Sequence, residues 1–204
     1  MPDLTLYVPT RDQVNVVARV LAEAFVDYPL YTYSIPNPKK RLPVLQTLYE
    51  VIVTYSMKYG KIYATSNQLE GVMCYLPKEA VILSNWRMVK SGALKIPLKF
   101  GFAFLKRVTP VTAKFDQQWA KYANFPHTYL WNIGVQPDQK GKGHASRLIR
   151  SLLADLAARN EPCYLGTVLE RNVRIYEHLG FQVMETCVIP EAHLTSWAMI
   201  WQKE

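Results

Sequence analysis

One continuous stretch, residues 129–145, constrains the fold more than any other part of this chain. It reads Tyr-Leu-Trp-Asn-Ile-Gly-Val-Gln-Pro-Asp-Gln-Lys-Gly-Lys-Gly-His-Ala. Its first half is an apolar run with aromatic and β-branched residues, which predicts a buried strand ending at Pro137. Beyond the glycines, apolar residues recur at helical spacing, at Leu148, Ile149, Leu152, Leu153 and Leu156. The stretch therefore predicts a strand, a glycine-bearing loop and a helix.

Such a loop before a helix favours the binding of an anion. The first amides of a helix have no intrahelical acceptor, and the helix dipole places positive charge there. Gly141 and Gly143 let the backbone approach a bulky ligand, and Lys140 and Lys142 add charge. No Gly-Lys-Ser/Thr closes the loop as in a P-loop, and its glycine spacing differs from the dinucleotide fingerprint. We expect a phosphate or pyrophosphate ligand.

A second motif follows at residues 172–181, Asn-Val-Arg-Ile-Tyr-Glu-His-Leu-Gly-Phe. On a helix, its Asn172 and Tyr176 lie one turn apart on the same face. A tyrosine that only anchors a helix to a sheet would also fit this pattern. The presence of both motifs, in order, favours a functional tyrosine.

The two motifs resemble those of the GNAT superfamily of acyl-CoA N-acyltransferases. Motif A there is Val-x-Pro-x-x-(Arg/Gln)-Gly-x-Gly-x-(Gly/Ala), and the matching residues here are Val135, Pro137, Gly141, Gly143 and Ala145. Lys140 stands at the usual Arg or Gln position. Motif B there is Asn-x-x-x-x-Tyr-x-x-x-Gly-Phe, and the Asn-to-Tyr spacing is one residue shorter in this chain.

This resemblance implies acetyl-CoA as cosubstrate and Tyr176 as the catalytic acid that protonates the departing thiolate. It also implies that backbone amides near Ile133 stabilise the thioester oxygen. The implied acetyl-CoA-binding residues are Ile133, Gly134, Val135, Lys140, Gly141, Lys142, Gly143, His144, Ala145, Ser146 and Asn172.

Within the superfamily, the chain is similar to the puromycin N-acetyltransferase group from its first helix to its end, except in a helical insert. The similarity includes residues 10–12, 24–29, 171–181 and 197–199. The chain departs from that group at Gly166, where an acidic residue is expected. The similarity therefore does not predict puromycin as the acceptor, and it leaves the general base unassigned.

The rest of the sequence predicts an α/β fold, a mixed sheet of six to seven strands flanked by helices, as one GNAT domain over residues 1–204. A first strand is expected at residues 4–8 and helices near 10–26 and 39–59. A hairpin is expected at residues 61–65 and 71–76, and strands at 129–135, 163–167, 181–188 and 194–201. The strands at 129–135 and 163–167 should be parallel, because a helix connects them.

The acceptor site is expected to include Asp27, Tyr28, Tyr31 and Trp131. In the GNAT fold the loop after the first helix forms one wall of that site, and this proline-rich loop carries Tyr28, Tyr31 and Tyr33. Surface packing would explain these aromatic residues equally well. The candidates for a general base are Asp27 and Glu170, although most such carboxylates are merely exposed.

Residues 86–125 form the insert before the central strand. Pro97 and Pro110 interrupt its helical spacing, and Gly92 and Gly101 loosen it, so two or three helices are expected. Basic residues alternate with apolar ones there, namely Lys90, Lys95, Lys99, Lys106 and Arg107. A helical cover over the sheet, walling the substrate site, is favoured over a basic amphipathic segment that touches a membrane.

The formal net charge of +8 suits a polyanion such as CoA. Because the basic residues are scattered, we expect no nucleic-acid partner and no stable membrane association. Cys74, Cys163 and Cys187 lie far apart in apolar runs, which predicts reduced core residues, no metal site and a cytoplasmic protein. A homodimer and a monomer both remain open.

The expected function is acetyl-CoA-dependent N-acetylation of the primary amine of a small molecule. The alternatives are a non-catalytic acyl-CoA-binding or regulatory module of the same fold, and a peripheral membrane protein that uses the basic insert. The acceptor is not specified by the sequence.

Overall fold

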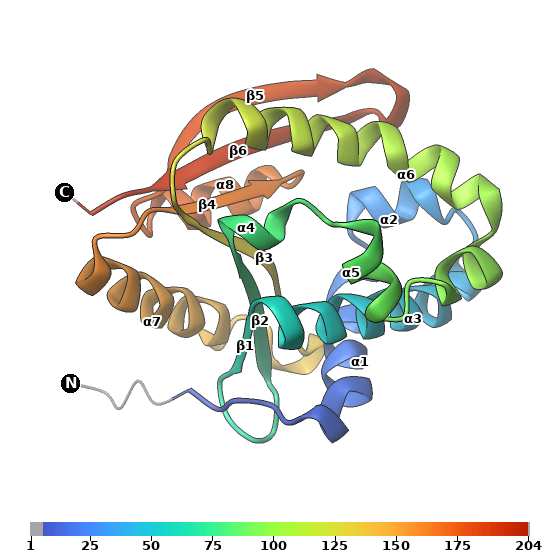
Figure 1. The fold of residues 1–204 in the computed structure, drawn as a ribbon, viewed down its shortest axis with the longest axis horizontal. Helices are drawn as coiled ribbons and strands as arrows, with labels where there is room; N and C mark the ends of the chain where they lie inside the picture. Colours follow the sequence, from blue (N-terminus) through green and yellow to red (C-terminus); the bar gives the residue numbers. More distant parts are fainter. Residues whose placement is uncertain (1–5, 204) are drawn as a thin grey trace.

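The computed structural model describes residues 6–203, which form a central sheet covered by helices on both faces (Figure 1). Three helices precede the first strand of the described sheet: α1 (Val14–Phe25), α2 (Pro29–Ser34) and α3 (Pro38–Tyr59). A short 3-10 turn, η1 (Arg11–Gln13), leads into α1, and Thr10 caps it through a capping box with Gln13. No helix among the described residues has the length and apolar character needed to cross a membrane.

Six strands make up the sheet within residues 6–203, in the spatial order β1-β2-β3-β4-β6-β5. They are β1 (Lys61–Ala64), β2 (Gly71–Pro77), β3 (Thr128–Val135), β4 (Cys163–Thr167), β5 (Gln182–Ile189) and β6 (Leu194–Trp201). β3 and β4 pair in parallel, and the other neighbours pair antiparallel. The predicted mixed α/β sheet, its hairpins and its parallel pair are confirmed.

The remaining helices connect these strands. Before β3 come α4 (Lys78–Val81), α5 (Asn85–Lys90) and α6 (Lys95–Tyr122). Between β3 and β4 lie η2 (Pro137–Gln139) and α7 (His144–Arg159), and α8 (Glu170–Glu177) precedes β5. A 3-10 turn, η3 (Pro190–Ala192), joins β5 to β6.

Two hydrophobic clusters fix the helices to opposite faces of the sheet. One joins α1, α2, α3 and α6 to the β1 and β2 side, and includes Val17, Leu21, Leu45 and Tyr49. The other joins α7 and α8 to the sheet through Leu148, Leu156, Val173, Tyr176 and Met199. The apolar stripe predicted for α7 points into the second cluster, as expected for an amphipathic helix.

The described part of the expected first strand is limited to one bridge between Tyr7 and Ala64, and residues 1–5 lie outside the described range. The loop expected after α1 is wrong in part, because Pro29–Ser34 is helical: Pro29 at the first helical position has a φ suited to a helix. The cysteine prediction is also wrong in part. Cys74 and Cys163 are buried, but Cys187 is half-exposed because β5 is an edge strand.

Residues 86–125 form two helices, most of α5 and all of α6, within the predicted two or three, and α6 covers the sheet as predicted. Figure 1 shows α6 running beside the β5–β6 hairpin, which it contacts. Pro97 occupies the first turn of α6, where no intrahelical N–H is needed, so it does not break the helix. Pro110 does not end the helix either. The irregularity lies at Gly101, whose φ of 67° kinks α6.

Candidate functional site

The glycine loop lies where β3 ends and α7 begins. Gly141 and Gly143 have φ values of 81° and 84°, a left-handed conformation that a residue with a Cβ adopts only with strain. No atom lies within 4 Å of the place where a Cβ on either glycine would be, so the space in front of the loop is open. The loop can therefore bring its backbone against a large ligand.

The start of α7 supplies hydrogen-bond donors to that space. The Arg147 amide donates to the Gly143 carbonyl at 2.9 Å and is the first amide of the intrahelical ladder. The amides of residues 144–146 precede this ladder and point out of the helix end. Lys140 is exposed, and the Lys142 ammonium donates to the Gln139 side chain at 3.0 Å. This arrangement suits a phosphate or pyrophosphate.

The loop is tied to the neighbouring β1–β2 turn. The Gln136 amide donates to the Glu70 carbonyl at 2.8 Å, and its side chain donates to the carbonyls of Gln68 and Leu69. His144 and Ala145 are half-buried at the helix start. Gly71 gives His144 its room, since a Cβ on Gly71 would lie 3.1 Å from the His144 Cβ. The site is thus held by a rigid hairpin.

β3 and β4 separate towards this loop. Their only pairs are Thr128 with Cys163 and Tyr129 with Tyr164, at one end of both strands. From residue 130 to 135 the β4-facing edge of β3 has no strand partner in the described sheet. Ile133 and Val135 are half-buried on this segment, whereas Gly134 is buried against Leu21 and Ala24 of α1. This free edge of β3 offers backbone hydrogen-bonding groups to an extended ligand.

Tyr176 lies beside this opening, on the last turn of α8. Its ring packs against Phe181 with the centroids 5.6 Å apart, and 8% of the residue is exposed. Burial raises the pKa of the Tyr176 hydroxyl well above its usual range, and the nearby Tyr28 contributes to the shift. The hydroxyl therefore keeps its proton at neutral and moderately alkaline pH. Asn172, one turn earlier, donates to the Thr167 hydroxyl at 3.5 Å.

Tyr28 closes the opening from the other side. Its hydroxyl accepts a hydrogen bond from the Val168 amide at 3.0 Å and lies 3.4 Å from the Thr167 Oγ1. Burial raises the pKa of Tyr28. The hydroxyl of Tyr31 lies 3.3 Å from that of Tyr49, and burial raises the pKa of Tyr31 to about 12. Two of the predicted acceptor residues thus meet in one aromatic cluster.

Trp131 belongs to the same neighbourhood. Its ring lies edge-on to Tyr55 of α3 at 5.7 Å, and it packs against the core cluster that Phe25 and Tyr28 also contact. The Nδ2 of the adjacent Asn132 is buried and has no hydrogen-bond partner within the described part of the chain. Buried side-chain donors are normally hydrogen-bonded, so this Nδ2 is available to a ligand acceptor. Asn132 was not among the residues selected from the sequence.

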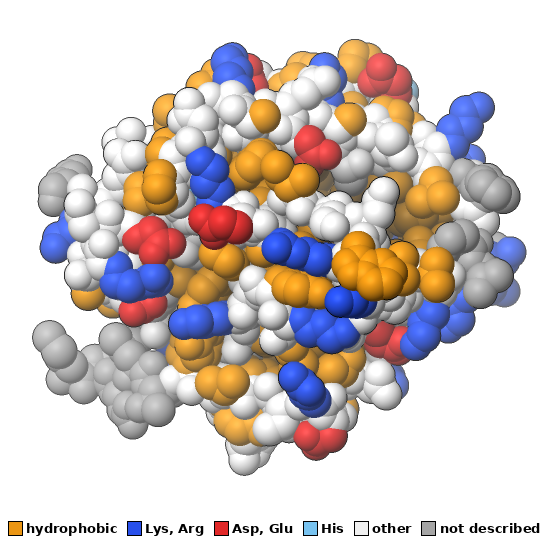
Figure 2. Space-filling model, in the orientation of Figure 1, with side chains coloured by type: hydrophobic (Ala, Val, Ile, Leu, Met, Phe, Trp, Pro, Cys, Tyr) orange, Lys and Arg blue, Asp and Glu red, His pale blue; other side chains and the backbone are white. Residues whose placement is uncertain are grey.

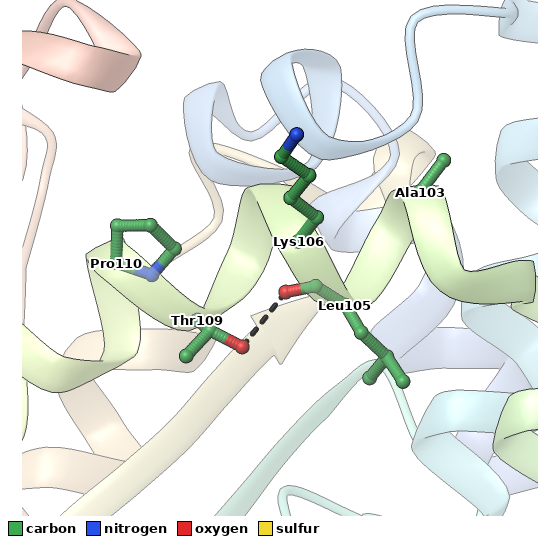
Figure 3. Close-up of a pocket in the computed structure, with 5 residues that line it drawn as sticks. All are labelled: Ala103, Leu105, Lys106, Thr109 and Pro110. Atoms are coloured by element: carbon green, nitrogen blue, oxygen red, sulfur yellow. Dashed lines mark hydrogen bonds between the residues drawn. The ribbon is translucent and has the colours of Figure 1, made fainter.

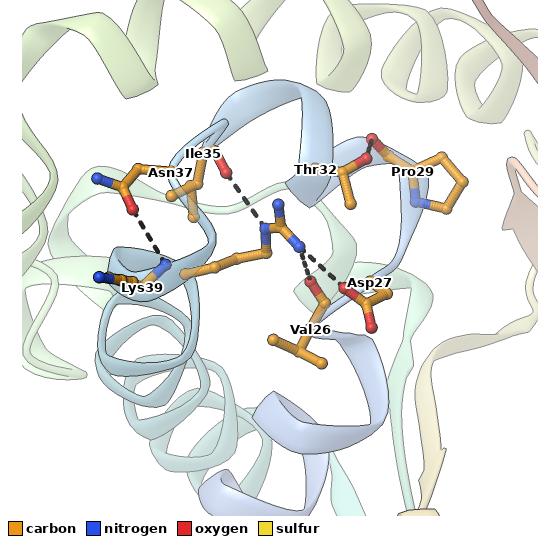
Figure 4. Close-up of polar contacts among 8 residues, drawn as sticks. Val26, Asp27, Pro29, Thr32, Ile35, Asn37 and Lys39 are labelled. Atoms are coloured by element: carbon orange, nitrogen blue, oxygen red, sulfur yellow. Dashed lines mark hydrogen bonds and ion pairs between the residues drawn. The ribbon is translucent and has the colours of Figure 1, made fainter.

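The two carboxylates considered as bases are placed differently. Asp27 is 84% exposed at its side chain and pairs with the Arg41 guanidinium at 2.9 Å. Arg41, which is 10% exposed at its side chain, also donates to the carbonyls of Val26 and Ile35 (Figure 4). The Arg41 side chain thus connects α3 to the turn between α1 and α2, and Asp27 neutralises the guanidinium charge. Glu170 pairs with Arg174 on the exposed face of α8.

Asp116, on α6, is a functional candidate that the sequence reasoning missed. Burial raises the pKa of its carboxyl, and its charge in turn contributes, after burial, to the raised pKa of Tyr129 and of Tyr164. Asp116 is exposed on α6, next in sequence to Phe115, whose ring lies 2.8 Å from the place of a Cβ on Gly166 of β4. Within residues 6–203 its carboxylate has no ion pair or hydrogen bond. The sequence offers one signal for Asp116: residues 80–115 contain no acidic residue, so it is the first one after Glu79.

The same helix explains the departure at Gly166. A Cβ on Gly166 would lie 2.8 Å from the Phe115 ring, so α6 fills the place that any side chain there would need. A side chain at this position would require the Phe115 ring to move. The neighbouring Asp116 brings a carboxylate to the region from the helix instead.

A depression on α6 is separate from this site. It is lined by Ala103, Leu105, Lys106, Thr109 and Pro110 (Figure 3). Pro110 has no N–H to offer the carbonyl four residues earlier, which loosens the helix there, and the Thr109 hydroxyl donates to the Leu105 carbonyl at 2.7 Å. The depression carries no group of reactive side chains.

Residues 101–183 match the sequence model of the acetyltransferase (GNAT) domain. An uncharacterized N-acetyltransferase of Schizosaccharomyces pombe is 22% identical over 170 residues, which cover 80% of this chain and 68% of that protein.

Two solved structures share the fold over nearly their whole length. A structure from Corynebacterium glutamicum, described as histone acetyltransferase HPA2 and related acetyltransferase, has a TM-score of 0.70 and 21% identity, and the match covers 98% of this chain and 96% of that one. Arylalkylamine N-acetyltransferase 2 of Aedes aegypti has a TM-score of 0.64 and 14% identity, with 97% and 98% covered.

Proposed function

We propose that this chain, whose residues 101–183 match the acetyltransferase (GNAT) domain, transfers the acetyl group of acetyl-CoA to the primary amine of a small molecule. The observation that carries the proposal is the open glycine loop at the start of α7. The loop follows the segment of β3 that does not pair with β4, and Tyr176 lies nearby. The pyrophosphate fits the amides of residues 141–146, and the pantetheine arm fits residues 133–135.

Acetyl-CoA supplies an activated thioester when bound. The bound ammonium first loses one proton to water. The neutral nitrogen then forms a bond to the thioester carbon, the carbon–sulfur bond breaks, and a second proton leaves the nitrogen to water. Unpaired β3 amides stabilise the negative charge that grows on the thioester oxygen. Tyr176 delivers its proton to the departing sulfur, and water restores it. No cysteine is needed, which agrees with the burial of Cys74 and Cys163.

The acceptor side favours an aromatic or alkyl amine. The half-buried Tyr28 and Trp131 offer aromatic rings that bind apolar groups and cations, and the buried Tyr31 supports Tyr28 from behind at a centroid distance of 6.2 Å. Asp116 provides a carboxylate without an ion pair in the described chain, suited to a protonated amine. Arylalkylamines are therefore the first acceptors to test, and one structure of the same fold is an arylalkylamine N-acetyltransferase.

The test is release of the CoA thiol from acetyl-CoA, measured with a thiol reagent over a panel of arylalkylamines, polyamines, aminoglycosides and amino acids. Turnover with at least one primary amine, and its loss when the amine is fully methylated, is the expected result. The product mass should rise by one acetyl group.

The alternative is an acyl-CoA-binding module without turnover. Two results together would favour that alternative. Calorimetry would show that CoA binds, and no amine would cause the native protein to release thiol faster than the Tyr176→Phe variant does. Absence of CoA binding would reject both.

A further inference from the structure

A second surface, formed by residues 82–95 on and around α5, combines exposed apolar side chains with cations. Ile82 is 70% exposed, Trp86 66% and Leu94 65%. Leu83 and Val89 are exposed beside them. Large apolar residues exposed singly are ordinary, but five within fourteen residues form a patch. We call these residues the 82–95 surface.

Along the sequence, the segment that contains this surface carries charge of one sign. Between Glu79 and Asp116 the sequence has no acidic residue, and its basic residues there are Arg87, Lys90, Lys95, Lys99, Lys106, Arg107 and Lys114. Seven positive charges lie in this segment, against a formal net charge of +8 for the whole chain. The positive charge is therefore concentrated, which the overall composition does not reveal.

Contacts within the molecule hold the surface in place with its apolar groups outward. The Arg87 guanidinium lies 5.1 Å from the Tyr59 ring and donates to the Glu79 carbonyl at 2.9 Å, which fastens α5 to the body. The Lys90 ammonium lies 5.0 Å over the outer Trp86 ring. Figure 2 shows hydrophobic and basic side chains intermixed over α5 and the neighbouring α3. The patch is part of the folded molecule.

We propose that the 82–95 surface docks on an anionic lipid bilayer. A bilayer presents phosphates above an apolar layer, which matches cations that surround Ile82, Trp86 and Leu94. Tryptophan beside lysine is the pairing that the membrane–water interface favours. A nucleic acid offers charge but no apolar layer for Ile82 and Leu94 to enter. A protein partner would have to be strongly acidic and apolar at once.

This docking is independent of acetyl transfer and uses none of the residues placed at the glycine loop. It is a peripheral, salt-sensitive contact, since much of it rests on charge that counterions screen. Attachment would hold the enzyme at a surface where apolar amines concentrate.

The experiment is co-sedimentation of the full chain with vesicles of phosphatidylcholine, with or without phosphatidylserine, at low and high salt. We expect binding to the anionic vesicles at low salt, a loss of at least about tenfold at high salt, and a similar loss without phosphatidylserine. Equal binding to both vesicle types, or none to either, would overturn the proposal.

Variants separate the two components of the surface. Trp86→Ser combined with Leu94→Ser, and Lys90→Gln combined with Lys95→Gln, should each weaken vesicle binding by about tenfold or more. The matched controls lie elsewhere and are equally exposed, Val188→Ser on β5 and Lys203→Gln at the chain end, and they should leave binding unchanged. Binding that survives both double variants, or that a DNA duplex competes away completely, would contradict a bilayer-specific surface.

Discussion

At the scale of single residues, Tyr176 carries the clearest chemical prediction. Tyr176→Phe keeps the ring against Phe181 and removes the proton. The native hydroxyl carries a proton at working pH, although burial raises its pKa and makes it a weaker acid than an exposed tyrosine. Turnover should fall by roughly ten- to a thousandfold, since water replaces a general acid only in part. Steady-state kinetics with an active amine measures this.

The control for Tyr176 is the acceptor KM together with thermal stability. The hydroxyl acts on the leaving sulfur, so KM should change little. An unchanged rate with a lowered melting temperature would instead show a purely structural tyrosine.

Asp116 gives a pH-dependent prediction. Its raised pKa means that the carboxylate is present only above that value, at higher pH than for an ordinary aspartate. As pH falls through this raised pKa, the KM for a cationic amine should rise. Asp116→Asn should raise KM at neutral pH and flatten this dependence, without lowering stability, because the desolvated charge is removed. Lys114→Gln, two positions earlier, is the control, and an equal KM effect there would argue against a specific contact.

Lys140 should contribute charge without fixing orientation, because it is exposed at the loop. Lys140→Gln should change the affinity for CoA by less than about tenfold, ~1.4 kcal/mol, as calorimetry would show. A larger loss would point to a specific contact from the ammonium.

At the scale of elements, the start of α7 predicts the behaviour of Gly143. Gly143→Glu places a carboxylate in the open space before the helix and should abolish CoA binding in calorimetry. Gly143→Ala imposes a similar backbone strain at φ 84° without the charge, so it separates strain from repulsion. CoA affinity that is unchanged in the glutamate variant would reject the loop as the pyrophosphate site.

The elements themselves were mostly predictable, and the failures have local causes. α1, α3, α7 and the β1–β2 hairpin follow from periodicity, because each buries one continuous face. α2 was missed, since Pro29 was interpreted as a loop residue although it begins a helix. α6 continues through Pro110 because its packing on β5 and β6 outweighs one lost hydrogen bond.

At the scale of the whole molecule, the site is assembled from segments that are far apart in the sequence. The Tyr28 hydroxyl reaches the Val168 amide across 140 positions, and Asp116 comes from the insert. The glycine loop and Tyr176 were predictable, because their motifs are local. Asp116 and Asn132 were not, because their importance depends on the crossing of α6 over β4 and on burial, which no local pattern encodes.

This architecture makes a prediction about stability. β3 and β4 do not pair beyond Tyr129. A ligand bound between them should therefore connect the β1-β2-β3 half of the sheet to the β4-β6-β5 half. CoA at about a hundred times its dissociation constant should raise the free energy of unfolding by ~2.7 kcal/mol, because it binds only the folded state. Hydrogen exchange should slow in residues 130–135 and at the start of α7. Pantetheine, which lacks the pyrophosphate, should protect only β3, and Gly143→Glu should lose the stabilisation by CoA. Protection confined to the α6 depression would place the ligand elsewhere.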